Sequence, residues 1–300
     1  MSIPTARSPL PHSAVRVGAI ALLAGGCAGS GRPAEPAPAP VPAPRPAATT
    51  PAAPAARPTA FAYAPGTYRY EVRTDAVVER PDARGERENV GTVAMVTYTL
   101  APQGRALGVT GQVESFAVSA GERVTAGAGD AGLQAPLPFR GTVDAAGARL
   151  STEGTLGQRC DGPFGAALTA ARETLVRFPA SLAPGTRWAD TTTALTCRGD
   201  VPATLQTIAR YEVVGRAEFA GTPAIHVRRQ TSTTLAGRGV AGGRPLTIAG
   251  AGTGTTSLYV DNARGRLLGA TGESRTTVTV RIANAAQEFV QRATLRVTAK

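Results

Sequence analysis

Lysine is almost absent from this 300-residue chain: Lys300 is the only one, so 31 of the 32 basic residues are arginine. A phosphate-binding loop of the Gly-Lys-Ser or Gly-Lys-Thr kind is therefore excluded. The formal net charge is nevertheless +11. Most arginines occur singly along the chain, without the local clusters and interleaved aromatic residues that nucleic-acid binding favours. We expect no specific nucleic-acid partner, and at most attraction to anionic lipid or polysaccharide. Representative positions are Arg69, Arg73, Arg105, Arg149, Arg228, Arg281 and Arg296.

Histidine is equally scarce, and beyond the N-terminal region only His226 remains. It alternates with Ile225 and Val227, which is typical of a surface residue on a strand. A Ser-His-Asp or Cys-His hydrolase would have to use this residue, and no nucleophile-elbow pattern accompanies it. Paired carboxylates are the other hydrolytic alternative, with Asp190, Asp200, Glu212 and Asp261 as the candidates. We assign no catalytic, cofactor-binding or metal site, and an enzyme is the less expected outcome.

A short apolar run near the start has the features of an export signal. Arg7 and Arg16 precede the apolar residues 17–23, which are too few to span a bilayer, and small residues follow up to Cys27. This Leu-Ala-Gly-Gly-Cys segment resembles the lipobox of bacterial lipoproteins, although Ala24 stands where that motif usually has leucine. The resemblance implies a signal peptide over 1–26 and lipidation of Cys27; the alternative is ordinary secretion with a free thiol. Since Ala28 is not aspartate, it also implies the outer membrane over the inner one.

The next segment is composed almost entirely of alanine and proline, and we expect residues 27–60 to be a lipid-anchored linker. It holds too few large apolar groups to build a core. Proline favours the extended polyproline form, so roughly 25 to 30 such residues reach on the order of 80 Å. A spacer behind an anchor is the preferred interpretation, and a proline-motif ligand is the alternative.

Residues 61–300 carry a period of two, which predicts one mainly antiparallel β domain. Apolar and polar residues alternate over 68–73, 277–282 and 294–298. Further strands are predicted near 90–100, 105–118, 138–143, 148–153, 186–197, 203–216, 223–235, 245–260 and 266–275. Turn residues separate these segments, which favours a barrel, half-barrel or sandwich.

One segment has helical spacing instead. Phe164, Leu168, Ala171 and Leu175 fall on one face, and Pro179 ends the element. We predict a single amphipathic helix over about 163–177, packed on the sheet.

The hairpin sequence around Gly104-Arg105 recurs at identical spacing around Gly265-Arg266, with a partial third copy near Val143-Asp144. Repeated use of one hairpin explains this echo directly, because glycine supplies the backbone angles that a tight turn needs. Duplication of a half-domain is the alternative hypothesis.

Apart from Cys27, the cysteines are the even pair Cys160 and Cys197, which in an exported chain favours a disulfide. Such a bridge would join the start of the helix to the strand that follows and stabilise the fold by roughly 3 to 4 kcal/mol. A redox-active pair and a structural zinc site are the alternatives, but they usually need a Cys-x-x-Cys motif and four ligands, respectively.

Together these features resemble uncharacterised secreted β-domain families of bacteria, a resemblance that implies a class but no activity. Three functions remain open. The first is a non-catalytic cell-envelope lipoprotein that binds a protein, glycan or lipid partner in the periplasm or at the surface. The second is a periplasmic carrier of acyl chains, because a sheet curved around a helix is similar to the half-barrel of lipoprotein carriers and of mycobacterial lipid-binding lipoproteins. The third is an envelope-polymer hydrolase that uses the carboxylates named above.

Overall fold

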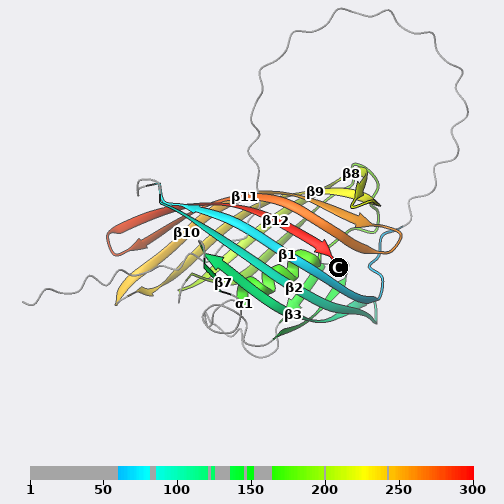
Figure 1. Ribbon diagram of the computed structural model, residues 1–300, viewed down its shortest axis with the longest axis horizontal. Coiled ribbons are helices and arrows are strands. Elements are labelled where there is room, and N and C mark those ends of the chain that lie inside the picture. The colour runs from blue at the N-terminus through cyan, green and yellow to red at the C-terminus, as the bar shows by residue number, and fades with distance from the viewer. Residues whose placement is uncertain are drawn as a thin grey trace, which may run out of the picture.

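Twelve antiparallel strands curl into a half-barrel in the computed structural model, and one helix packs on the inner face of the sheet (Figure 1). The structure describes residues 60–81, 86–120, 123–125, 136–144, 147–151, 164–198, 201–241 and 243–300. The predicted fold class is confirmed, and of the three architectures left open by the sequence, the half-barrel is the one formed.

The strands match the predicted alternating segments closely. They are β1 (Gly66–Glu79), β2 (Arg87–Gln103), β3 (Ala106–Ala120), β4 (Arg123–Thr125), β5 (Leu137–Asp144), β6 (Gly147–Ser151), β7 (Arg187–Arg198), β8 (Val201–Phe219), β9 (Thr222–Ala241), β10 (Arg244–Asp261), β11 (Arg266–Ile282) and β12 (Ala285–Ala299). The helix α1 spans Phe164–Thr174, inside its predicted range. Two predicted segments, 266–275 and 277–282, form the single strand β11. The short β4 was not predicted, because three residues are too few to show alternation.

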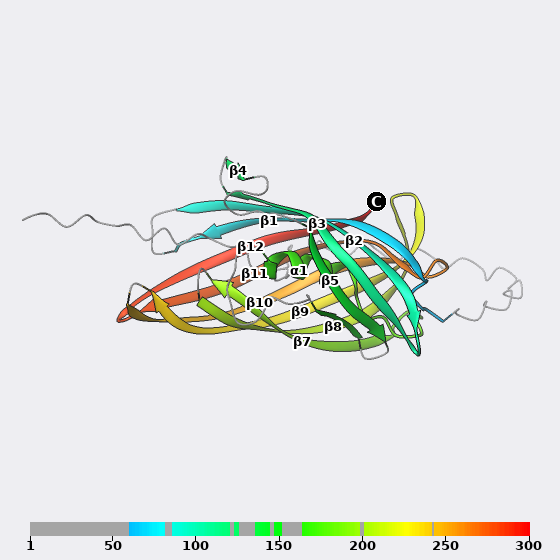
Figure 2. The ribbon, with the colours of Figure 1, turned by 90° about the horizontal axis from the view of Figure 1, so that it is seen from below.

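Strand order explains how the helix comes to lie inside the curl. The order is β6-β5-β3-β2-β1-β12-β11-β10-β9-β8-β7, so the first and last long strands, β1 and β12, are neighbours in the sheet. Strands β6 and β7 lie at its two opposite edges, and α1 lies between them in the chain. The helix contacts β1, β2, β3 and β5 on one side and β7 on the other. Figure 2 shows α1 within the curl, between β12 and β7.

Apolar residues occupy the inner face and pack against the helix. Even-numbered residues of β1, β10 and β11 point inward, as do odd-numbered residues of β8, β9 and most of β12. On the helix, Ala167 and Ala171 are fully buried, and such small side chains let the helix backbone approach the sheet closely. The largest fully buried side chains of the protein are Tyr70, Tyr98, Phe139, Leu100, Leu258 and Leu267.

Aromatic side chains hold the C-terminal end of the helix. The last carbonyl groups of a helix have no partner within the helix and need donors from elsewhere. Tyr98 Oη donates to the carbonyl oxygen of Thr174, the last helix residue, at 3.2 Å. In the segment that follows the helix, Tyr63 Oη donates to the carbonyl oxygen of Val176 at 2.6 Å, and Trp188 Nε1 donates to that of Arg177 at 3.0 Å. These three aromatic residues therefore combine apolar packing with a hydrogen bond to the backbone at or just after the helix end.

Buried tyrosines make the fold sensitive to alkali. Burial raises the pKa of Tyr70 to about 12 and raises the pKa values of Tyr63 and Tyr98 well above 10. In the unfolded chain these phenols ionise near pH 10. The stabilisation by neutral Tyr70 is therefore complete below pH 10 and is lost as the pH rises toward 12.

We expect the free energy of unfolding to fall by about 2 kcal/mol between pH 10 and pH 12 from Tyr70 alone. Urea unfolding at a series of pH values checks this. The chain has a single lysine, so most of the titration in this interval is that of tyrosines, and the buried Tyr63 and Tyr98 add to the fall. The Tyr70→Phe variant should show a shallower fall with pH; an unchanged slope contradicts the assignment.

The echoed sequences do form hairpins, but with different turns. Gly104 lies in the two-residue turn between β2 and β3, and Gly265 lies in the four-residue turn between β10 and β11. Both have a positive φ, 61° and 55°, which glycine adopts without strain. In the second turn, the backbone N–H of Arg264 donates to Asp261 Oδ1 at 3.0 Å. Both sequences therefore form hairpins, but the turns differ in length; repeated use of one hairpin and duplication of a half-domain both stay hypotheses.

A second apolar cluster lies on the inner face and contains no helix residue. Its buried members are Val201, Ala203, Leu235, Leu246, Ile248 and Val278. Between this cluster and the helix-side core lies a buried polar belt, which includes Arg229, Thr233, Thr256, Ser274 and Thr276. Arg229 Nη2 donates to Glu173 Oε2 of the helix at 2.7 Å and to Thr256 Oγ1 at 3.1 Å. The belt thus holds a buried ion pair that ties the helix to the sheet.

Candidate functional site

Polar side chains form ordered rows on the outer face of the sheet, opposite the helix. The registers of β1, β12, β11 and β10 align Arg73, Arg296, Thr271 and Ser257 in one row. Aligned residues on adjacent strands lie close together, with Cβ atoms about 5 Å apart. Two arginines, Arg73 and Arg296, therefore face each other directly across β1 and β12.

Two further rows lie alongside. The next row aligns Asp75, Thr294, Glu273 and Thr255 on the same four strands. The row beyond it places Arg292 of β12 directly opposite Arg275 of β11. Acidic residues and threonines thus lie between two pairs of arginines.

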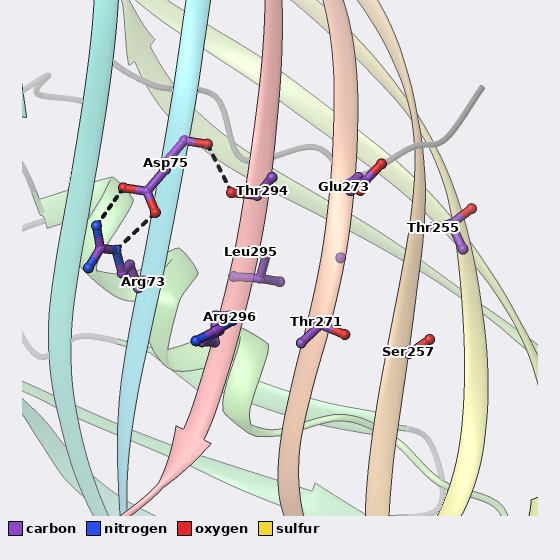
Figure 3. A pocket seen from close by; sticks show the side chains of 10 residues that line it. Arg73, Asp75, Thr255, Ser257, Thr271, Glu273, Thr294, Leu295 and Arg296 are labelled. Atoms are coloured by element: carbon purple, nitrogen blue, oxygen red, sulfur yellow. Dashed lines mark hydrogen bonds and ion pairs between the residues drawn. The ribbon is translucent and has the colours of Figure 1, made fainter. Parts of the chain in front are cut away.

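These rows line a continuous hollow, which we call the outer groove. One part has a volume of about 590 Å³ and is lined by Arg73, Asp75, Thr255, Ser257, Thr271, Gly272, Glu273, Thr294, Leu295 and Arg296 (Figure 3). The adjoining part, of about 660 Å³, shares Asp75, Glu273 and Thr294 and adds Arg275 and Arg292 among others. Figure 3 shows α1 behind the strands, so the groove opens on the face away from the helix.

The charges in the groove are only partly neutralised. Arg73 Nε and Nη2 donate to the two oxygens of Asp75 at 2.9 and 3.2 Å, and these hydrogen bonds raise the pKa of Arg73. Within the described residues, Arg275, Arg292 and Arg296 make no ion pair within 4.0 Å, and all three are exposed. Like charges that face each other across strands destabilise a sheet. Arg275 and Arg292 therefore favour an anion between them, whereas Arg296 faces an Arg73 whose charge Asp75 already offsets.

Sequence reasoning missed this cluster, because it treated Arg73 and Arg296 as isolated positions 223 residues apart. Their proximity depends on the pairing of β1 with β12, which no local pattern reveals. The pair Arg275 and Arg292 had a local signal. They lie at equal distances from the turn at Ala283 and Asn284, so the hairpin alone aligns them.

The single histidine of the described residues lies beside the groove. His226 Nε2 is 3.0 Å from Ser257 Oγ, and its ring stacks on Tyr259 with centroids 5.3 Å apart. Phe219 stacks on the same tyrosine at 4.7 Å. Partial burial, and then the charge of Arg228, lower the pKa of His226, so the imidazole is neutral at pH 7. A serine–histidine contact is thus present, but its charged neighbour is an arginine where a catalytic triad has a carboxylate.

The candidate carboxylates are not brought together. Glu212 is on the outer face, where it accepts from Arg187 at 2.9 Å and also from Arg228. Asp190 aligns with the buried Ala209 and so belongs to the inner face. Asp261 is buried in the β10–β11 turn beside Arg264, and Asp200 lies outside the described residues. Asp190, Glu212 and Asp261 therefore form no common cleft, as paired-carboxylate hydrolysis requires.

The predicted cysteine sites fall largely outside the described part of the chain. Cys27 and Cys160 lie beyond it, and of Cys197 only the backbone is described, within β7. Lipidation of Cys27 and the bridge between Cys160 and Cys197 stay predictions. Among the described residues, no group of three or more His, Cys, Asp or Glu side chains is placed to hold a metal ion. No helix in that part has the length and hydrophobicity to cross a bilayer.

Comparison with known proteins assigns no family. No family model and no curated protein matches the chain. Among solved structures, Pseudomonas aeruginosa OpdQ is similar over 78% of this chain and 98% of its own, with 6% identity and a TM-score of 0.23. A LolA superfamily protein from Nitrosomonas europaea is similar over 75% of this chain and 83% of its own, with 7% identity and a TM-score of 0.15. At TM-scores this low, neither similarity bears on the fold or function of this chain.

Proposed function

We propose that this chain is a non-catalytic cell-envelope lipoprotein that binds a partner in its outer groove. The observation that carries the proposal is the outer groove itself, in which exposed arginines, carboxylates and hydroxyl groups from four long strands converge. Strands paired over this length form a rigid platform, and rigid platforms position binding groups with little loss of conformational entropy on binding.

The predicted lipid-anchored location in the cell envelope fits a binding role. A lipid on Cys27 and the alanine- and proline-rich linker up to residue 60 place the half-barrel at a distance from the membrane. At that distance the domain can reach soluble or wall-bound partners while it stays attached.

Site-specific photo-crosslinking in the native envelope tests this proposal. A photo-reactive amino acid at Thr271, on the groove floor, should capture an envelope component in cells that produce the full-length chain. The matched control is Thr247 of β10, an exposed threonine that lies on the same outer face of the sheet but does not line the groove. Capture should also be lost when Arg292→Glu and Arg296→Glu are combined with the Thr271 probe. Equal capture at both positions, or capture that ignores the arginines, rejects the groove as the binding surface.

A carrier of lipid or lipoprotein acyl chains is the second candidate. The observation in its favour is the half-barrel itself, with one helix inside the curl and a second apolar cluster on the inner face beyond that helix. The space directly under the helix is filled by contacts between Ala167, Ala171 and the sheet, so a carrier would need the helix to move. Mass spectrometry of lipid extracted from the purified protein distinguishes this candidate from the first.

A further inference from the structure

We infer that the outer groove binds an acidic polysaccharide, whose anionic groups are held by two arginine pairs, Arg73 with Arg296 and Arg275 with Arg292. The inference rests on the proposed function and adds the chemical class of the ligand. It follows from the placement of the arginines, from the groups between them and from what the groove lining lacks.

Each arginine pair forms a site for one anion. Arg73 and Arg296 are aligned across β1 and β12, and Arg275 and Arg292 are aligned across β11 and β12. A guanidinium group binds carboxylate, sulfate or phosphate through two parallel N–H···O bonds. Two guanidinium groups on neighbouring strands can therefore hold one anionic group from both sides. Between Arg275 and Arg292 the anion removes the repulsion within the pair. Between Arg73 and Arg296 it binds beside Asp75, which already pairs with Arg73.

The distance between the two sites selects a polymer over a single small anion. Arg292 and Arg296 are four residues apart on β12 and point to the same face, so the two pairs are separated by about 13 Å. A single carboxylate or phosphate reaches only one pair. A chain whose charged groups recur with neutral units between them reaches both.

The groups between the two pairs suit sugar hydroxyls. Thr294 lies midway on β12, and the carboxylates of Asp75 and Glu273 flank it on the neighbouring strands. Threonine hydroxyls donate and accept hydrogen bonds, and carboxylates accept them, so this row can bind the uncharged part of a glycan. The same carboxylates repel a ligand with a negative charge on every unit.

Nucleic acid fits the groove less well for two reasons. Every nucleotide carries a phosphate, so a strand that reaches both arginine pairs also places a phosphate near Asp75 and Glu273. In addition, the residues that line the two parts of the groove include no aromatic side chain on which bases could stack.

Binding of defined polymers to the full-length chain tests the inference. The probes are hyaluronate, whose carboxylates lie on alternate sugars, neutral dextran, polyphosphate, single-stranded DNA and phosphatidylglycerol vesicles. We expect hyaluronate to bind, neutral dextran not to bind, and affinity for hyaluronate to fall steeply as salt rises from about 50 to about 200 mM. Polyphosphate, DNA or vesicles that bind as tightly as hyaluronate overturn the assignment to an acidic glycan.

Charge-matched variants locate the site. Combining Arg292→Glu with Arg296→Glu should weaken hyaluronate binding at least about tenfold, because each lost charge-assisted contact is strong. The control combines Arg238→Glu with Arg281→Glu, which makes the same change in net charge at exposed positions outside the groove. It should weaken binding less than about twofold. Equal losses in the two variants indicate non-specific attraction and overturn the inference.

The two experiments distinguish failure of the proposed function from failure of the inferred ligand class. If crosslinking at Thr271 depends on the arginines but hyaluronate does not bind, the groove is a binding surface and only the ligand class is wrong. If the Thr271 probe captures nothing and no polymer binds, the proposed function and the inference are both wrong.

Discussion

Replacing Gly265 with alanine is expected to destabilise the protein by about 3 kcal/mol or more. Gly265 has a φ of 55°, where a side chain costs roughly 1 to 2 kcal/mol. A Cβ atom there would also lie 2.1 Å from the carbonyl oxygen of Ala62 and 2.8 Å from the nitrogen of Ala64. Both are backbone atoms, so the segment before β1 would have to move.

That movement has further consequences for the core. The N–H of Ala64 donates to the carbonyl oxygen of Gly265 at 3.0 Å, and the same segment buries Phe61 and Tyr63. Displacing it exposes apolar surface, and burial of one large apolar side chain contributes about 1.5 to 3 kcal/mol. The cost at Gly265 therefore exceeds that of backbone strain alone.

The repeated hairpin sequence supplies the control variant. Gly104 stands at the position of the repeat that corresponds to Gly265 and has a φ of 61°, but no atom lies within 4 Å of a Cβ added there. Gly104→Ala should cost only the strain, about 1 to 2 kcal/mol. Urea unfolding of both variants measures the difference. Equal costs would show that the segment before β1 does not pack on this turn as the structure describes.

The second large effect is expected at the buried ion pair of Arg229 and Glu173. The two side chains are 10% and 19% exposed, and their closest nitrogen and oxygen atoms are 2.7 Å apart. Burial would by itself lower the pKa of Arg229, but the Glu173 carboxylate offsets this and raises it above its ordinary value. Removing one partner leaves the other with little compensation, which for buried pairs costs about 3 to 5 kcal/mol.

A double-mutant cycle measures this coupling. We expect Arg229→Met and Glu173→Gln each to cost about 3 kcal/mol, and the double variant to cost less than their sum by about 2 kcal/mol. The control is the exposed pair of Arg80 and Glu86, whose side chains are 38% and 64% exposed. Glu86→Gln should cost less than about 1 kcal/mol. Additive costs at Arg229 and Glu173 would contradict the pairing of helix and sheet through these two residues.

Local chemistry accounts for what the sequence predicted correctly. A strand with one buried and one exposed face must alternate, so β1, β8 and β12 are visible in the residue pattern itself. The helix is visible because its apolar residues recur at helical spacing before Pro179. The turn at Gly265 is visible because only glycine adopts its backbone angles without strain.

Interactions between distant segments account for what was missed. The curl of the sheet around α1 depends on β6 and β7 lying at opposite edges, and a period of two is the same in a barrel, a half-barrel and a sandwich. The candidate carboxylates were chosen by residue type, yet the face on which Asp190 and Glu212 lie depends on the register of β7 and β8.

The sequence by itself determined the strands, the single helix, the turns and the expectation of an exported, anchored domain, because each depends on residues close together in the chain. Only the tertiary structure decided that the sheet is a half-barrel, that the helix lies inside it and that Arg73 meets Arg296. The physical reason is that β1 and β12 are joined by hydrogen bonds between backbones, which carry no residue-specific signal. The candidate site lies across that junction, so its most important neighbours appear only after the chain has folded.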